Sequence, residues 1–167
     1  MTSQNDPEIR RVGFGALTAR RLVLAQQFEI GLMYHEESSA YAVLDAPGKP
    51  TEYDFSDGAR GAFFVAYLDG RPAGCGGIRT FSYDAPDTAE IKRMYTRPEA
   101  RGYGIARAVV VALEDAARSF RYQSVRLETG LVQPAAIALY EKMNYRRTAR
   151  YGKYAGDPLS RCYQKVL

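Results

Sequence analysis

The sequence has one histidine and two cysteines among its 167 residues. Zinc sites, and nucleophiles activated by a histidine, need several such side chains within reach of one another. His35 lies in the stretch YHEESS, outside every motif described below, and we expect it at the surface. Cys75 and Cys162 are far apart in the chain. The sequence therefore predicts no metal and no catalysis by a histidine-activated serine or cysteine.

Long apolar runs are also missing. The longest aliphatic stretch, AVVVAL at 108–113, is too short to cross a bilayer, because a spanning helix needs about 20 apolar residues. The N-terminal stretch MTSQNDPEIR is polar and lacks the apolar centre of a signal peptide. Without an export signal, the two cysteines are expected to be free, buried thiols in a reducing compartment. We expect a cytoplasmic protein with no membrane contact.

No segment is strongly basic or acidic. The 23 Lys and Arg residues exceed the 19 Asp and Glu residues by a net charge of +4 and are scattered along the chain. A nucleic-acid-binding protein would present a contiguous basic face, so no nucleic acid is expected, and the small positive excess favours an anionic small ligand. With 46% apolar and 25% charged residues, the chain is long enough for one globular domain. We expect residues 1–7 to be a disordered N-terminus and residues 8–167 to form that domain.

The predicted elements indicate an α/β protein, of the α+β kind with a mixed sheet. Residue spacing and turn signals predict strands at 8–14, 61–68, 72–81, 89–96, 124–129, 145–151 and 160–167 and helices at 18–34, 105–120 and 133–143. The order β-α-β-β-β-α-β-α-β-β gives a sheet of six to seven strands flanked by helices. The strand–helix–strand crossover over 89–129 implies at least one parallel pair.

Local signals add detail to this order. The dipeptide Asp69-Gly70 between two strand-like runs predicts a tight hairpin. Thr18 stands where the first helix could take its N-cap. Turn residues over 44–60 predict a long surface loop. The helical spacing of the second helix predicts a buried face made of Ile105, Val109, Ala112, Leu113, Ala116 and Phe120.

The second helix opens with a glycine-rich loop, RPEARGYGIARA at 97–108. A helix N-terminus carries unpaired N–H groups and a partial positive charge, so it binds anions readily. Gly102 and Gly104 would let the backbone approach a phosphate, while Arg101 and Arg107 add positive charge. A tight turn between a strand and a helix would explain the two glycines equally well.

Two familiar phosphate loops do not fit this stretch. A Walker loop needs a lysine and a hydroxyl residue after its last glycine, and a dinucleotide fingerprint needs a third glycine where Arg107 stands. The pattern R-x-x-G-x-A does fit, with Arg101, Gly104 and Ala106. It resembles the coenzyme A loop of the general N-acetyltransferase (GNAT) superfamily.

The resemblance extends over residues 8–167. The stretch AEIKRMYTRPEARGYGIARAVVVALEDAAR is similar to the fourth strand, pyrophosphate loop and third helix of that family. LETGLVQPAAIALYEKMNY is similar to its fifth strand and fourth helix, with Gln133 where most members have asparagine. The tail YGKYAGDPLSRCYQKVL resembles the last hairpin of a bacterial subgroup that acetylates small molecules. The resemblance implies the GNAT fold.

The resemblance also implies a site for acetyl-CoA between the fourth and fifth strands. Backbone groups of Met94 and Thr96 would pair with the pantetheine amides, and an N–H near Met94 could polarise the thioester carbonyl. The expected coenzyme-binding residues are Met94, Tyr95, Thr96, Arg101, Gly102, Tyr103, Gly104, Ile105, Ala106, Arg107, Gln133 and Tyr140.

Two catalytic residues are expected from the same resemblance. Tyr140 matches the tyrosine beside the sulfur and would donate a hydrogen bond to the leaving thiolate; a plain core position is the alternative. Glu90 is the expected general base, acting through a water. A salt bridge with Lys92 or Arg79 is the alternative role for Glu90, with Glu128 the substitute base.

The acceptor is expected to be a primary amine of a small molecule. Alternation along the fourth strand places Glu90, Lys92 and Met94 on one face and Arg93 on the other, unless a bulge turns Arg93 inward. Lys92 or Arg93 would then hold the carboxylate of an amino-acid-like acceptor. A solvated strand edge, or contact with coenzyme A phosphates, would explain both cations as well.

The sequence thus favours an acetyl-CoA-dependent N-acetyltransferase, and it leaves homodimer formation open. An acyl-CoA-binding sensor without transferase activity is the second hypothesis, although such a module would need neither Tyr140 nor Glu90. A nucleotide-binding oxidoreductase is the third, and the failed dinucleotide fingerprint argues against it.

Overall fold

The computed structural model describes residues 6–34, 50–83 and 85–167. Residues 1–5 of the expected N-terminal tail, and His35, lie outside these ranges. The described residues form seven strands and three α-helices in the predicted order: β1 Glu8–Val12, α1 Leu17–Met33, β2 Ala62–Leu68, β3 Arg71–Thr80, β4 Thr88–Thr96, α2 Ile105–Ser119, β5 Ser124–Gly130, α3 Pro134–Lys142, β6 Arg146–Arg147 and β7 Ser160–Val166.

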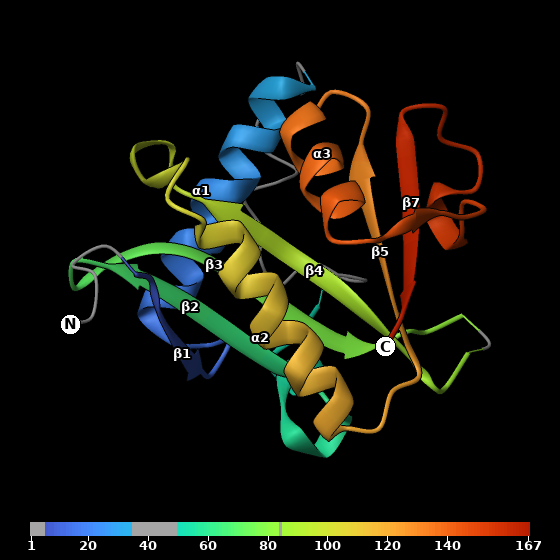
Figure 1. The fold of residues 1–167 in the computed structure, drawn as a ribbon, viewed down its shortest axis with the longest axis horizontal. Helices are drawn as coiled ribbons and strands as arrows, with labels where there is room; N and C mark the ends of the chain where they lie inside the picture. Colours follow the sequence, from blue (N-terminus) through green and yellow to red (C-terminus); the bar gives the residue numbers. More distant parts are fainter. Residues whose placement is uncertain (1–5, 35–49, 84) are drawn as a thin grey trace.

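The seven strands form one mixed sheet with the order β1-β2-β3-β4-β5-β7-β6. Every neighbouring pair is antiparallel except β4 and β5, which are parallel and joined through α2. Two parallel neighbours need a connection that returns the chain to the end of the sheet where the first strand began, and α2 provides this connection. In Figure 1, α2 and α3 lie on the near face of the sheet and α1 on the far face. The expected mixed sheet flanked by helices is confirmed.

The β2–β3 hairpin closes at the predicted dipeptide. Asp69 and Gly70 both have positive φ angles, 50° and 75°. Two consecutive residues in this region form the tight turn whose twist matches that of the flanking strands.

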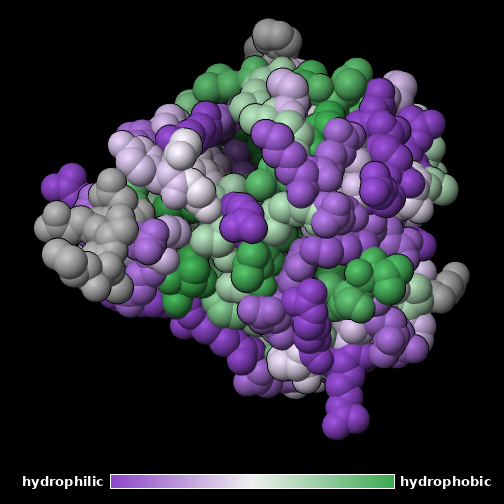
Figure 2. Space-filling view, in the orientation of Figure 1, coloured by the Kyte–Doolittle hydropathy of each residue, from purple (hydrophilic) through white to green (hydrophobic). Residues whose placement is uncertain are grey.

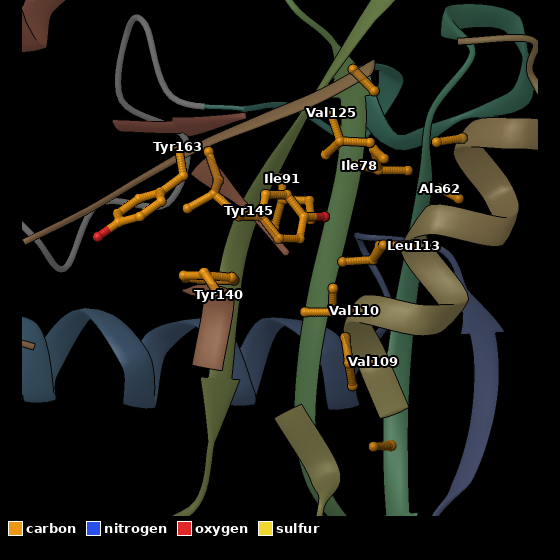
Figure 3. Close-up of a cluster of buried hydrophobic side chains, with 14 of the residues drawn as sticks. Ala62, Ile78, Ile91, Val109, Val110, Leu113, Val125, Tyr140, Tyr145 and Tyr163 are labelled. Atoms are coloured by element: carbon orange, nitrogen blue, oxygen red, sulfur yellow. The ribbon is translucent and has the colours of Figure 1, made fainter. Parts of the chain in front are cut away.

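The main core lies between the sheet and the two near-face helices. Figure 3 shows side chains of α2 meeting those of the sheet in this cluster. Within α2, Ile105, Val109 and Leu113 are buried as predicted. Ala112, Ala116 and Phe120 are only half-buried, although Ala116 and Phe120 still pack against this core. The other fully buried residues of α2 are Val110, Glu114 and Ala117, so its buried face is rotated from the predicted one.

The burial of Glu114 explains why the sequence pattern misplaced that face. Lys165 on β7 donates to both of its carboxylate oxygens, at 2.8 and 2.9 Å, and the Tyr145 hydroxyl donates at 3.1 Å. A buried carboxylate is tolerated when it is paired in this way. Because these partners come from distant parts of the chain, helical spacing alone could not identify Glu114 as a buried residue.

Two further expectations need correction. Thr18 is not an N-cap: α1 starts at Leu17, after a turn in which the Ala16 N–H donates to Gly13 O at 3.0 Å. The strand expected over 145–151 shrinks to Arg146–Arg147, although Thr148 N still donates to Cys162 O at 3.0 Å.

The loop expected over 44–60 is described from Pro50 onward. It contains two 3₁₀ turns, η1 Tyr53–Phe55 and η2 Asp57–Ala59. Phe55 is buried against Phe14 and Phe63, with ring centroids 4.8 and 5.4 Å away. This part of the loop therefore belongs to the second core, on the α1 face.

The outer surface is predominantly polar on the side of β5 and β7, with smaller groups of apolar residues between the polar ones (Figure 2). Among the described helices, none combines the length and the apolar character that a membrane crossing requires.

Candidate active site

The site begins where β4 and β5 stop pairing. Their parallel register runs from Thr88↔Ser124 to Ile91↔Leu127, yet β4 continues to Thr96 and β5 to Gly130. Figure 1 shows the two strands diverging beyond this point. The gap lies at the carboxyl ends of a parallel pair, which is where open α/β sheets bind their ligands.

A β-bulge in β4 accompanies this divergence. Lys92 pairs with Gly77 and Tyr95 with Cys75, so that two residues of β4 stand opposite Gly76. Arg93, one of the two, has a positive φ of 62°. A bulge bends and twists its strand, which directs the end of β4 away from β5.

The bulge corrects the expected assignment of faces. A Cβ added to Gly76 would meet Met94 Sδ and Val109 of α2, so Met94 lies on the α2 face of the sheet. Glu90, Lys92 and Arg93 instead line one pocket on the α1 face. The expected inward turn of Arg93 at a bulge is what the structure shows.

An apolar cleft of about 450 Å³ occupies the gap between the diverging strands. The ends of α1 and β4, the loop before α2, the first turn of α2 and the N-terminal part of α3 all contribute to it. Tyr103 does not line the cleft and is 50% exposed. The other expected coenzyme-binding residues all line it: Met94, Tyr95, Thr96, Arg101, Gly102, Gly104, Ile105, Ala106, Arg107, Gln133 and Tyr140.

The N-terminus of α2 opens directly on the cleft. Gly104 is the N-cap and has a φ of 76°, a left-handed conformation that glycine adopts without strain. A Cβ at Gly104 would meet no described atom within 4 Å, so the backbone there is open to a ligand. The first N–H groups of α2 have no partner inside the helix. This cradle suits a pyrophosphate.

Two buried polar atoms fit the pantetheine arm of coenzyme A. Gln26 of α1 donates from Nε2 to Met94 O at 2.8 Å, while its Oε1 has no partner among the described residues. Thr96 Oγ1 is likewise buried and unpartnered there. Both residues line the cleft. Unsatisfied buried polar atoms are rare, and the amide groups of a pantetheine chain would satisfy them. The residues present therefore fit coenzyme A.

The Arg101 side chain is held at the edge of the cleft by two contacts. Its Nη2 forms an ion pair with Glu29 of α1, and its Nε donates to Thr96 O at 3.2 Å. Arg101 thereby links α1 to the end of β4, beside the loop that the sequence pattern identified.

Tyr140 lies on the inner wall of the cleft. It is 4% exposed, and its ring packs edge-on against Tyr145 with centroids 5.7 Å apart. Its hydroxyl has no hydrogen-bond partner among the described residues. Burial raises the pKa of Tyr140, and the charge of Glu128 raises it further. The hydroxyl is therefore held protonated, as a donor facing the cleft.

A second pocket, of about 300 Å³, lies on the α1 face of the sheet. It brings together Glu90, Lys92 and Arg93 of β4, of which Arg93 joins the other two only because of the bulge. Ile30 and Gln133 line both cavities, so the cleft and the pocket are neighbours. Further lining residues are Gln27, Tyr34, Pro50, Arg79, Tyr83, Glu128, Lys153, Tyr154 and Asp157.

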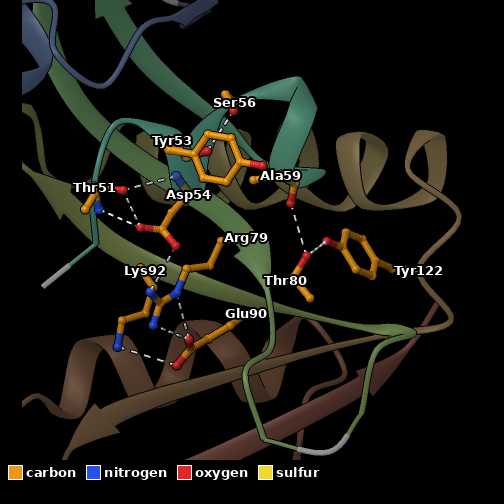
Figure 4. Close-up of polar contacts among 10 residues, drawn as sticks. All are labelled: Thr51, Tyr53, Asp54, Ser56, Ala59, Arg79, Thr80, Glu90, Lys92 and Tyr122. Atoms are coloured by element: carbon orange, nitrogen blue, oxygen red, sulfur yellow. Dashed lines mark hydrogen bonds and ion pairs between the residues drawn. The ribbon is translucent and has the colours of Figure 1, made fainter. Parts of the chain in front are cut away.

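Glu90 is engaged in ion pairs, as the alternative role expected. It is 1% exposed. Arg79 Nη2 is 3.0 Å from its Oε2 and Lys92 Nζ is 3.5 Å from its Oε1, and Tyr151 donates to Oε1 at 3.3 Å. Arg79 also reaches Asp54, 3.7 Å away (Figure 4). Both oxygens of Glu90 are thus occupied.

The contribution of α1 was missed by the sequence analysis. Gln26 and Gln27 are both buried, one facing the cleft and the other the pocket. The available signal was a pair of amides on the inward side of an otherwise apolar helix face. Within the described ranges, no group of three or more histidine, cysteine or acidic side chains could hold a metal ion.

Known proteins resemble this chain over most of its length. A model of the acetyltransferase (GNAT) family matches residues 30–145. Over 142 residues, the chain is 35% identical to IAA acetyltransferase of Azospirillum brasilense, a match that covers 83% of each protein.

Solved structures share the fold over nearly the whole chain. A Klebsiella pneumoniae protein assigned to the acyl-CoA N-acyltransferases has a TM-score of 0.74 at 27% identity, covering 96% of this chain and 97% of that one. The PaiA N-acetyltransferase of Thermoplasma acidophilum, solved with coenzyme A, has a TM-score of 0.72 at 15% identity, covering 97% and 99%. The chain therefore belongs to the acetyltransferase (GNAT) family, and it is an N-acetyltransferase.

Proposed function

We propose that this enzyme transfers the acetyl group of acetyl-CoA to the primary amine of a small, amino-acid-like molecule, by direct attack of the amine on the thioester. The adjacency of the two cavities carries this proposal. Because Ile30 and Gln133 line both, a thioester at the inner end of the cleft would face an amine in the pocket. A binding module without transferase activity would need the cleft alone.

The cleft residues divide the binding of acetyl-CoA among them. The N–H groups at the start of α2 would hold the pyrophosphate, and the backbone of Met94 and Thr96 would pair with the pantetheine amides. Gln26 Oε1 and Thr96 Oγ1 supply the side-chain partners. An N–H at the bulge near Met94 would polarise the thioester carbonyl. Tyr140 would donate a hydrogen bond to the leaving thiolate.

The size and charge of the pocket favour an acceptor with a carboxylate. A volume of about 300 Å³ is at the small end of the range for ligand pockets, which suits an amino acid. Glu90 already neutralises part of the charge of Arg79 and Lys92. Burial lowers the pKa of Arg93, and nearby Arg79 lowers it further, although Tyr154 raises it. An anion in the pocket would stabilise these charges, whereas a polyamine would be repelled.

Paired acceptors test this specificity. We would measure the turnover of L-aspartate, L-phenylalanine and L-leucine, and the turnover of the three matching amines that lack the α-carboxylate. The enzymes compared are the parent, Lys92→Met and Arg93→Met. Arg71→Met, which removes an exposed cation at the start of β3, is the control for net charge. The parent should prefer the carboxylate-bearing partner, and at least one pocket variant should lose most of that preference.

Two results would contradict the proposed acceptor class. One is a carboxylate preference that both pocket variants retain at the level of Arg71→Met. The other is faster turnover with spermidine than with any amino acid. Release of free thiol from acetyl-CoA in the presence of the amines is the common measurement.

The cellular location of the protein and its macromolecular partners stay predictions. Cys75 and Cys162 are free and buried, which supports a reducing, cytoplasmic location. We infer no nucleic-acid or membrane partner, and homodimer formation stays open.

A further inference from the structure

Glu128 is a carboxylate of the acceptor pocket with an open oxygen. It lies on β5, one residue beyond the last β4–β5 pair at Leu127, and it is half-buried. The Ser160 hydroxyl donates to Oε1 at 2.7 Å. Among the described residues, no cation lies within ion-pair distance of Glu128, and Oε2 has no hydrogen-bond partner. A proton or an ammonium group can therefore approach Oε2 from the pocket.

Glu90 differs from Glu128 in each of these respects. Its Oε2 accepts from Arg79, and its Oε1 from Tyr151, with Lys92 close by. It is almost completely buried. Protonating Glu90 would remove the counter-charge of half-buried Lys92 and the closer of the two carboxylates that pair with half-buried Arg79, which is costly. The geometry gives Glu90 the role of holding Arg79 and Lys92 in the pocket wall.

The surroundings of Glu128 suit a group that exchanges a proton. Burial raises the pKa of Glu128, while the Ser160 hydrogen bond and the charge of Lys92 lower it. Asp157 raises it again and Lys153 lowers it. The groups that face Glu128 come from β4, α3, the turn Gly152–Tyr154, the segment before β7, and β7 itself: Lys92, Tyr140, Tyr151, Lys153, Tyr154, Asp157 and Ser160.

Glu128 is also electrostatically coupled to Tyr140. Its charge is one of the causes that raise the pKa of Tyr140, although Tyr140 lines the cleft and Glu128 lines the pocket. The carboxylate and the phenol thus stand on either side of the junction where the thioester and the amine would meet. One can accept a proton while the other donates a hydrogen bond.

We propose that Glu128, not Glu90, binds the acceptor's ammonium group and is the general base of the reaction, a proposal that rests on the proposed function. Glu128 takes one proton from the ammonium group, and the freed amine nitrogen forms a bond to the thioester carbon. The carbon–sulfur bond then breaks while Tyr140 donates a hydrogen bond to the leaving thiolate. The second nitrogen proton passes to that thiolate, and Glu128 releases its proton to solvent. Ammonium and acetyl-CoA thus give amide, thiol and one proton.

The pH dependence of turnover tests this assignment. With the best acceptor of the amine panel, the parent should show an acid limb in kcat/KM, since activity appears only as Glu128 loses its proton. Glu128→Gln should lower kcat/KM by about 10²- to 10⁴-fold, the range of a lost general base, and abolish that limb. Coenzyme A affinity, measured by calorimetry, should stay within about twofold of the parent value because Glu128 does not line the cleft.

Two further variants separate catalysis from support of the fold. Glu90→Gln should retain the acid limb even if its turnover or stability falls. Ser160→Ala removes a donor to the charged carboxylate and should move the limb to higher pH by about one unit, since a hydrogen bond to a charge is worth about 1.5 kcal/mol and one pH unit corresponds to about 1.4 kcal/mol. A purely structural role for Glu128 would produce no such shift.

The outcomes are distinguishable. If Glu128→Gln keeps near-parental kcat/KM with its acid limb intact, or if Glu90→Gln alone loses the limb, the assignment to Glu128 is overturned and the proposed function stands. If the parent releases no thiol with any amine, both are overturned.

Discussion

Tyr140 presents a buried hydroxyl to the cleft without a partner among the described residues. Tyr140→Phe removes that hydroxyl and keeps the ring, so acetyl-CoA affinity and the melting temperature should change little. Turnover should fall about 10- to 1,000-fold, because the thiolate loses its hydrogen-bond donor. Steady-state kinetics together with calorimetric binding of coenzyme A would measure both effects.

Tyr145 is a matched control for this substitution. Its hydroxyl donates to buried Glu114 at 3.1 Å, and Tyr145 itself does not line the cleft, although its ring packs against Tyr140. Tyr145→Phe should lower the free energy of unfolding by roughly 1.5–3 kcal/mol, the range for a hydrogen bond to a charged group, and leave turnover close to parental. Equal turnover in the Tyr140→Phe enzyme and the parent would return Tyr140 to a core role.

The sequence alone could not tell which of the two glutamates has a free carboxylate oxygen. Their residue type and strand positions predict carboxylates near the site, and both Glu90 and Glu128 do line the pocket on the α1 face. Which one is free depends on partners supplied from elsewhere. Arg79 comes from β3 and Tyr151 from the loop before β7, and their approach to Glu90 is a property of the folded chain alone.

The loop before α2 and the helix itself act as one element. The glycine pattern predicted where the helix starts, because the conformation at Gly104 is local, and the start of the helix does face the cleft. The bulge in β4 could not be located in the same way. It depends on pairing with Gly76 of β3, and it moved Met94 to the opposite face from the one that simple alternation predicts.

Gly104→Ala tests this element, with Gly70→Ala as its control. Both glycines have φ near 75°, and a Cβ at either would meet no described atom within 4 Å. Each substitution should therefore destabilise the fold by a similar amount, about 1–2 kcal/mol for a left-handed alanine. Only the alanine at position 104 would project into the cleft. Coenzyme A should bind at least tenfold more weakly to that variant alone.

Comparing these two variants separates the loss of ligand contact from the cost of backbone strain. Calorimetric titration with coenzyme A and thermal unfolding would be run on both. If the two variants melted alike and bound coenzyme A as tightly as the parent, the glycine loop would be a turn between strand and helix and nothing more.

At the scale of the whole molecule, the cleft joins elements that are far apart in the chain. Its walls include α1 at Gln26 and α3 at Tyr140, on either side of the β4–α2 segment. The order of elements and the family's motifs predicted this arrangement, since topology places the ends of β4 and β5 beside the N-terminus of α2. The contribution of α1 came only with the structure, because helical spacing does not say which strand a helix crosses.

A ligand that bridges these elements should stabilise the entire fold. At a concentration of 100 times its Kd, coenzyme A would add about 2.7 kcal/mol to the free energy of unfolding, or roughly 5–10 °C in Tm for a chain of this length. Adenosine 3′,5′-bisphosphate should raise the Tm less at the same concentration, because it lacks the arm that Gln26 and Thr96 would hold. NAD⁺ should have no effect. A Tm that rose with NAD⁺ and not with coenzyme A would mean that the cleft serves a dinucleotide, against both the proposed function and the missing third glycine at Arg107.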